Sequence, residues 1–193
     1  MNVDDKKITA SPFEFIAGSL SLCFVDTLGG RGGELNERLS CDRDFANWLQ
    51  AAGLTIALDH GDLDQAKLLR TAIYEVCRAV VSGAEINAFD LETLNRFAVV
   101  PPLRPQVTNN GRTEYTAEDP FSAALSTIAE DAINLLSGEF RARIRICSGC
   151  QMVFVDKSRP GKRRWCSSAS GCGNKAKMAA RRQRAKISRI SNF

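Results

Sequence analysis

The chain has 193 residues, of which 44% are hydrophobic and 25% are charged, a composition that excludes a disordered or collagen-like protein. The longest candidate for an apolar span, residues 15–25, has eleven residues, whereas a membrane helix needs about 20. Glu14 interrupts the region in which a secretory signal would lie. We therefore expect a cytoplasmic protein with no membrane partner, in which free thiols are normal.

The net charge of +4 conceals two regions of opposite sign. Residues 141–193 contain 15 lysines and arginines and one acid, Asp156, which gives +14, whereas residues 1–140 carry −10. This asymmetry indicates two modules with different partners, which we predict as residues 1–140 and 141–193. The basic module favours a polyanionic partner, of which nucleic acid is the commonest.

The first 60 residues give mixed signals. Residues 13–28 are apolar and compatible with a strand, although Gly18 interrupts them. The glycine-rich residues 29–33 predict a flexible loop, because they lack the Lys-Ser/Thr ending and the strand–turn–helix context of a phosphate-binding loop. A short helix is expected between Ser40 and Gly53. Its predicted inward side chains are Phe45, Trp48 and Leu49.

Three longer helices follow, over residues 62–83, 89–98 and 119–138. Asp62 begins the first in a sequence typical of a capping box, and Asp119 precedes a proline at the first position of the third. Apolar residues recur at three- and four-residue spacing along both helices, as a helix with one buried face requires. They are Leu63, Ala66, Leu69, Ile73, Val76 and Val80 in the first, and Leu125, Ile128, Ala132 and Leu135 in the third.

A β-hairpin is predicted before the last of these helices. Residues 103–108 and 112–116 flank Asn109-Asn110-Gly111, and such turn residues tolerate positive φ. Helices dominate and strands are few, so we predict an α+β first domain that is mainly helical and carries a small sheet or hairpin. After Gly138, arginines alternate strictly with apolar residues over 141–146, which predicts a strand with one arginine face and one apolar face.

Four of the seven cysteines lie in the basic module: Cys147, Cys150, Cys166 and Cys172. Two residues between the first pair allow a tight knuckle that aims both sulfurs at one point, and two such pairs complete the tetrahedral shell of zinc. A closed shell predicts one structural zinc ion, and the alternatives are four unligated core cysteines or a redox pair. The other three cysteines have apolar neighbours and are expected to be buried and inert. They are Cys23, Cys41 and Cys77.

The segment between the cysteine pairs predicts a second hairpin. Its strands are expected over residues 152–156 and 163–166, joined by a turn at Ser158-Arg159-Pro160-Gly161. A helix is expected to begin near Cys172, where its N-terminus would stabilise the thiolate. A knuckle, a hairpin and a helix together predict a treble-clef-like zinc finger with a C-terminal basic helix.

The run from Ser158 to Cys166, with Trp165 before the cysteine, and the run Cys172-Gly173-Asn174-Lys175-Ala176-Lys177 resemble the CGNR zinc-finger family of bacterial proteins. Residues 20–27 and the helix with Trp48-Leu49 resemble its usual N-terminal partner, the ABATE domain. The chain departs from the family pattern at Lys175, where the name-giving arginine would stand, and in having five rather than four residues between the last two cysteines. The resemblance implies a stress-induced transcription regulator with a regulatory or dimerisation domain at residues 1–140.

Residues 174–190 predict a basic helix. At 1.5 Å per residue, Lys175 to Arg189 spans about 21 Å, or about six base-pair steps, so the helix could lie in a major groove. We predict nucleic acid, and duplex DNA first, as the partner of nine cations. They are Arg163, Arg164, Lys175, Lys177, Arg181, Arg182, Arg184, Lys186 and Arg189. The alternatives are a solvated helix or one docked on the acidic module, while Trp165 is expected in the core of the finger and Asn174 at the start of the helix.

Other function classes remain open at this point. An enzyme is not predicted, because the single histidine, His60, fits a loop position and no nucleophile elbow, metalloprotease motif or dinucleotide fingerprint occurs. RNA could replace DNA as the partner, although the finger lacks the pair of exposed aromatics that single strands favour. The first module could bind a small molecule as a sensor, mediate protein interactions, or form a homodimer that strengthens the binding of a single finger.

Overall fold

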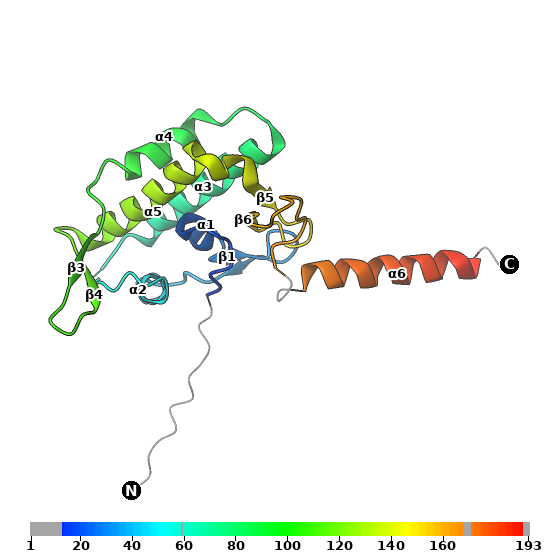
Figure 1. Ribbon diagram of the computed structural model, residues 1–193, viewed down its shortest axis with the longest axis horizontal. Helices are drawn as coiled ribbons and strands as arrows, with labels where there is room; N and C mark the ends of the chain where they lie inside the picture. The colour runs from blue at the N-terminus through cyan, green and yellow to red at the C-terminus, as the bar shows by residue number, and fades with distance from the viewer. Residues whose placement is uncertain (1–12, 59, 168–170, 191–193) are drawn as a thin grey trace, which may run out of the picture.

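Figure 1 shows the computed structural model of the chain, which describes residues 13–58, 60–167 and 171–190, with side chains up to residue 184. These residues form six α-helices and three two-stranded antiparallel sheets, so the fold is α+β as predicted. The hairpin of β3 (Arg104–Val107) and β4 (Thr113–Thr116) lies at one end of the molecule, and α6 (Cys172–Ile190) projects from the other (Figure 1). Within the described part of the chain, every helix is too short or too polar to cross a bilayer.

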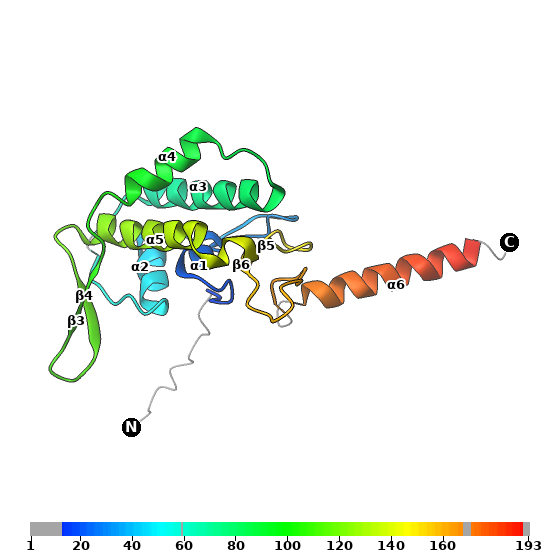
Figure 2. The same cartoon turned by 45° about the horizontal axis from the view of Figure 1, so that its top comes forward.

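The helical body is formed by α3 (Leu63–Ser82), α4 (Ala88–Phe97) and α5 (Pro120–Ser137), which pack on one another (Figure 2). The Asp62 carboxylate accepts hydrogen bonds from the backbone N–H groups of residues 64 and 65, and Asp119 accepts one from Ser122. These bonds satisfy N–H groups that have no partner within the helix. The three helices predicted from caps and apolar spacing are therefore confirmed.

The apolar run at residues 13–28, whose sequence was compatible with a strand, contains a helix. The Ser19 hydroxyl accepts a hydrogen bond from the Leu22 N–H and caps α1 (Leu20–Val25), which is buried from Ser21 onward. A helix that is buried on nearly all sides shows no amphipathic period, so its sequence is indistinguishable from that of a buried strand. This short helix contacts three elements: α3 and α5 of the helical body, and the strand that follows the first two cysteines of the finger.

The predicted helix between Ser40 and Gly53 is confirmed as α2 (Asp42–Ala51). Its N-terminus is fixed by the Asp44 carboxylate, which accepts hydrogen bonds from the N–H groups of Ser40 and Cys41. The ring of Trp48 lies 5.2 Å from that of Phe24 in an edge-on contact, and this aromatic cluster anchors α2 to α1. All three predicted inward side chains are buried.

Two small hairpins extend from the body. The predicted hairpin pairs β3 with β4 from Arg104 opposite Thr116 to Val107 opposite Thr113, and Gly111 in its turn has φ of 74°. In the glycine-rich segment, β1 (Leu28–Gly29) pairs with β2 (Asn36–Glu37), so the predicted loop is the turn of a short hairpin. Both turns need residues that tolerate positive φ, which the sequence supplies.

The strand predicted at residues 141–146 covers only the second half of that segment. A 3₁₀ turn, η1 (Glu139–Arg143), comes first, and β5 (Ile144–Ile146) follows it. The Arg141 guanidinium donates to the Leu136 carbonyl at 2.8 Å, where α5 leaves carbonyls without partners. In the first half of the segment, the alternating arginines therefore belong to the turn that ends α5 and do not form one face of a strand.

The hairpin predicted between residues 152–156 and 163–166 was wrong in its pairing. The first of these segments forms β6 (Val153–Val155), which pairs with β5 from Ile144 opposite Val155 to Ile146 opposite Val153. The turn between the two strands is the knuckle with Cys147 and Cys150 itself, so the partner of β6 precedes the first cysteine. The predicted turn at residues 158–161 does exist, since the Gly161 N–H donates to the Ser158 carbonyl.

The buried core continues from the helical body into the finger. Ile144, Val153, Phe154 and Val155 belong to the same cluster of buried side chains as the residues of α3 and α5. The Val155 N–H also donates to the Ala17 carbonyl at 2.7 Å. The boundary between two modules at residue 140 thus stays a prediction, because the core crosses it.

Candidate metal centre and basic helix

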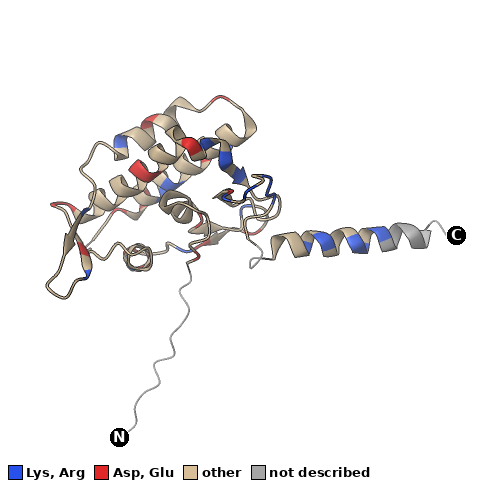
Figure 3. Ribbon diagram, in the orientation of Figure 1, with Lys and Arg blue, Asp and Glu red and all other residues tan. Residues whose placement is uncertain are grey.

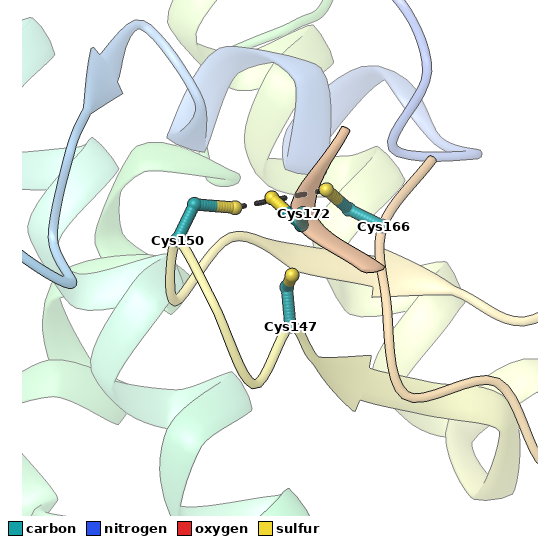
Figure 4. Close-up of side chains that lie close together, drawn as sticks. All are labelled: Cys147, Cys150, Cys166 and Cys172. Atoms are coloured by element: carbon teal, nitrogen blue, oxygen red, sulfur yellow. Dashed lines mark hydrogen bonds between the residues drawn. The ribbon is translucent and has the colours of Figure 1, made fainter. Parts of the chain in front are cut away.

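The four cysteines of the basic module meet at one point (Figure 4). The sulfur atoms of Cys147, Cys150, Cys166 and Cys172 all lie within 4.8 Å of one another. The sulfurs of Cys150 and Cys166 are 3.6 Å apart, which is too long for a disulfide. Four thiolates around zinc at about 2.3 Å would lie about 3.8 Å apart, so the spacing fits one zinc ion.

Backbone hydrogen bonds shape the knuckle. The Cys147 N–H donates to the Met152 carbonyl at 2.9 Å, and the Gln151 N–H donates to the Cys147 carbonyl at 3.1 Å. Gln151 has φ of 61°, the one positive value among non-glycine residues in the described ranges. These bonds turn β5 sharply into β6 and hold the first two sulfurs on the same side, as two intervening residues allow.

The other two cysteines approach from outside this hairpin. The Ser148 N–H donates to the Arg164 carbonyl at 3.0 Å, which holds the loop before Cys166 against the knuckle. Cys172 is the first residue of α6, as predicted, so its sulfur comes from the root of the helix. The site joins three segments that are separate in the sequence: the knuckle, the following loop and the basic helix.

The electrostatics of the cluster favour a metal. Burial raises the pKa of the Cys147 thiol, but backbone N–H donors from the knuckle and from Cys166 outweigh it and lower this pKa to about 7. Burial, with the adjoining thiols, raises the pKa of Cys150. Sulfurs held this close cannot all ionise unless a cation joins them, and zinc supplies that charge. The cluster is positioned to bind one zinc ion, and four sulfur ligands leave no position for catalysis.

Asp156, the single acid of the basic module, fixes the loop between the cysteine pairs. Its buried carboxylate accepts hydrogen bonds from the N–H groups of Ser158 at 3.0 Å and Arg163 at 2.8 Å. Although burial opposes this, these donors and the Arg163 charge lower the pKa of Asp156 to about 2. Sequence reasoning missed this role, although one acid among fifteen cations was a signal for it.

The glycine-rich turn between β1 and β2 touches the knuckle, a contact that the sequence did not predict. A Cβ atom on Gly32 would lie 2.3 Å from the Gly149 carbonyl oxygen. The turn is held by Arg31, which donates to the Val25 carbonyl at 3.0 Å and lies over the Tyr74 ring at 4.2 Å. The N-terminal body therefore supports the metal cluster directly.

The predicted nucleic-acid cations lie in two groups. On α6, the described cations are all exposed: Lys175, Lys177, Arg181, Arg182 and Arg184. The side chains of Lys186 and Arg189 lie outside the described residues, although their backbone belongs to the helix. Arg163 and Arg164, in the loop before Cys166, are exposed as well. Figure 3 shows the lysines and arginines distributed along the projecting helix.

Arg163 differs from the other cations in being tethered. Its guanidinium donates to the Cys166 carbonyl and lies 5.3 Å from the centre of the Phe154 ring. Trp165 is half-buried and packs against the core, as predicted, but it also lines a surface cavity. Asn174 is exposed in the first turn of α6.

The remaining candidate groups offer no second site. His60 is exposed just before α3. Cys23 and Cys77 are buried as expected, and burial raises the pKa of the Cys77 thiol to about 12. Cys41 is exposed at the start of α2, so the expectation that it is buried was wrong. Its immediate neighbours in the sequence, Ser40 and Asp42, are polar and agree with an exposed position.

Two family models match the chain. Residues 18–139 match the ABATE model, described as "Putative stress-induced transcription regulator", and residues 143–185 match the model of the CGNR zinc finger. The second match includes all four clustered cysteines and most of α6. No curated protein matches the chain.

Proposed function

The chain belongs to the ABATE family and carries a CGNR zinc finger, and on this premise we propose that it is a transcription regulator that binds duplex DNA through α6. Neither matched family is described as an enzyme. The proposal places the protein in the cytoplasm, where it would act on DNA in response to stress. The observation that carries it is the projection of a basic helix from the metal cluster (Figure 1).

The shape and charge of α6 support a groove contact. The helix has 19 residues and is therefore about 28 Å long. From Lys177 to Arg184 its described side chains are exposed, so the body leaves this part of the helix accessible around its circumference. An α-helix fits the major groove, where arginine can contact guanine edges and lysine can contact phosphates.

The metal centre supports the proposal mechanically. We assign the four clustered cysteines as zinc ligands, and zinc would supply the bond between the root of α6 and the knuckle. Cys147 and Cys150 are held by the β5–β6 hairpin, in which β6 is buried in the common core. Through Cys172, the direction of α6 is then fixed relative to the body. A fixed helix binds with less loss of conformational entropy than a mobile one.

The N-terminal body would regulate or pair this helix. A single finger makes few contacts, and two copies bound to adjacent half-sites would gain affinity through effective concentration. Exposed apolar side chains on and after α4 are candidates for the contact between copies. They are Phe89, Leu91 and Val99. A small-molecule signal bound by the body is the other form of regulation that we propose.

The test is selection of bound fragments from a random duplex DNA pool by the full-length protein, followed by titration of the selected fragment. If α6 neutralises about five phosphates, the logarithm of the association constant falls with the logarithm of salt at a slope near −4.5. Replacing Arg181, Arg182 and Arg184 by glutamine should flatten this slope. Replacing three exposed arginines outside the finger, Arg43, Arg104 and Arg112, is the matched control and should leave it unchanged.

Two outcomes would overturn the proposal. Equal slopes for the α6 variant and the control would remove the basic helix from the interface. Tighter binding to single-stranded or duplex RNA of the same sequence would make RNA the target, because A-form grooves and the 2′-hydroxyl select different contacts.

A further inference from the structure

A basic cleft lies between the loop that precedes Cys166 and the first turns of α6. Its volume is about 610 Å³, within the range of cavities that hold small ligands. The side chains that line it include Arg163, Arg164, Trp165, Asn174 and Lys177. None of these is acidic, and the sequence contains no acid after Asp156. The cleft therefore favours an anion.

The indole of Trp165 forms a fixed wall of the cleft. A Cβ on Gly173 would lie 3.2 Å from Trp165 Cδ1, and one on Gly149 would lie 3.5 Å from its Cζ3. The ring is thus enclosed by the first turn of α6 on one edge and by the knuckle on another. A side chain at Gly173 would crowd the ring, whereas the contact at Gly149 is an ordinary van der Waals distance, so the position of the indole depends most closely on the first turn of α6.

Arg164 is oriented by this wall. Its guanidinium lies 5.8 Å from the centre of the Trp165 ring, within the range of a cation–π interaction. Among the described residues, the guanidinium has no hydrogen-bond partner, and the Lys177 ammonium has none either. Arg163 is different, because its guanidinium is already bonded to the Cys166 carbonyl. Both cations thus line the cleft with their donors unused, and Trp165 orients the one on Arg164.

We propose that this cleft binds one phosphate group of the nucleic-acid backbone, through a forked contact from Arg164 and a charge contact from Lys177. Trp165 is then a positioning residue that acts through Arg164. This assignment rests on the proposed function and adds a phosphate site at the root of α6. A phosphate suits the cleft better than a base for two reasons. The Arg164 guanidinium already lies over the Trp165 ring, on which a base would stack, and a guanidinium can bond two phosphate oxygens at once.

The experiment measures duplex binding by anisotropy across salt concentrations, with the full-length zinc-loaded protein and its Arg164→Gln and Lys177→Gln variants. Each lost phosphate contact should reduce the salt slope by about 0.9 and weaken binding about eightfold at 0.1 M salt. Arg112→Gln, which removes one exposed charge from the distant hairpin, is the matched control. Zinc content and circular dichroism check that each variant is folded.

A second measurement tests the role of Trp165. Trp165→Leu should weaken binding in the wild-type background and have no further effect in the Arg164→Gln background, whereas a purely structural defect would weaken both. In the wild-type protein, Trp48 is fully buried, so acrylamide quenching of fluorescence reports on Trp165. Bound duplex should protect Trp165 from acrylamide.

The outcomes separate this proposal from the broader one. If duplex binding depends on Arg181, Arg182 and Arg184 but not on Arg164 or Lys177, the cleft proposal fails and DNA binding by α6 stands. If no duplex binds at any salt concentration, both fail. If inorganic phosphate or a free nucleotide protects Trp165 and duplex does not, the cleft serves a small phosphate compound, and the backbone assignment is overturned.

Discussion

Gly32 in the β1–β2 turn packs directly against the Gly149 carbonyl in the knuckle, with room for no side chain between them. A Cβ on Gly32 would also lie 3.3 Å from the Cα of Cys150. The two residues are far apart in the sequence, yet their contact joins the backbone of the N-terminal body to the loop that holds two sulfurs. The position of the knuckle therefore depends on the body, and a change in the body can reach the metal cluster.

Gly32→Ala tests this contact. The added methyl group must displace the Gly149 carbonyl, because backbone cannot move aside as a flexible side chain can. We expect a destabilisation of about 1–3 kcal/mol and faster loss of zinc to a chelator. Thermal unfolding and the rate of zinc transfer to a colorimetric chelator measure the two effects.

Gly33→Ala is the matched control, because a Cβ at that position meets nothing within 4 Å. It should leave both the unfolding temperature and the transfer rate close to wild type. Equal zinc-transfer rates for the two variants would show that the contact does not hold the knuckle.

The metal stoichiometry gives a second prediction. Wild-type protein should contain about one zinc ion per chain, and Cys147→Ser should lose it, because three thiolates do not complete the tetrahedral shell. Zinc contributes about 10–16 kcal/mol to small sites of this kind. Since Ile144 of β5 and all three residues of β6 are buried in the common core, the helical body should remain folded when the metal is removed.

Metal analysis by mass spectrometry and circular dichroism check these expectations. Cys41→Ser is the matched control, since Cys41 is exposed and lies outside the cluster. Stoichiometric zinc in a variant that lacks both Cys147 and Cys150 would refute the assignment of the ligands.

The pKa of Asp26 predicts a pH dependence of stability. Burial raises this pKa to about 6, and Arg38, whose Nη1 lies 3.5 Å from the carboxylate, lowers it only in part. The folded chain therefore binds the proton more tightly than the unfolded chain, and stability falls as pH rises from about 4 to 6. From the difference in pKa, the loss is roughly 3 kcal/mol.

Asp26→Asn should remove this part of the pH dependence and stabilise the protein above pH 6, as measured by urea unfolding at several pH values. Glu92→Gln, on the exposed surface of α4, is the control for loss of one carboxylate. If Asp26→Asn is less stable than wild type at pH 8, the ion pair with Arg38 outweighs the cost of burying the charge.

Local signals in the sequence predicted most of the helices. Asp62 and Asp119 cap α3 and α5 by accepting hydrogen bonds from N–H groups within four residues. A short stretch of sequence is therefore enough to predict both caps. The segment around α1 could not be assigned in this way, because its side chains are buried on several sides and leave no period. The pairing of β5 with β6 was not predicted, because the residues between the two strands carry the spacing of a metal knuckle and no turn signal of a hairpin.

The candidate site was predictable where chemistry fixes the spacing of residues. Cys147 and Cys150, two residues apart, had to lie together for one metal to join them, and the Ala-, Lys- and Arg-rich run after Cys172 predicted the start of a helix there. No rule of residue spacing predicts the contact of Gly32 with Gly149 or the buried carboxylate of Asp156. Both depend on segments that meet only after the chain has folded. Nor did the sequence show that Arg163 is tied to a carbonyl whereas Arg164 is not.

The ion pair between the buried Arg70 and the partly exposed Glu37 gives the last prediction. Arg70 is 3% exposed, and it donates to Glu37 through both terminal nitrogens and to the Thr27 hydroxyl at 3.0 Å. Glu37→Gln leaves the buried guanidinium without its counter-charge; breaking a fully buried pair costs about 3–5 kcal/mol, and because Glu37 is partly exposed we expect a loss below that range. Arg70→Met should cost less, because Glu37 is 33% exposed and can be hydrated while methionine fills the buried space.

Urea unfolding at pH 7 measures this asymmetry, with Glu34→Gln in the exposed part of the same hairpin as the control. Because β2 carries Glu37 and the adjoining turn contacts the knuckle, Glu37→Gln should also speed the transfer of zinc to a chelator, as Gly32→Ala does. A larger destabilisation for Arg70→Met than for Glu37→Gln would mean that the hydrogen bonds of the guanidinium to Thr27 and Glu37, which methionine cannot make, hold the hairpin in place.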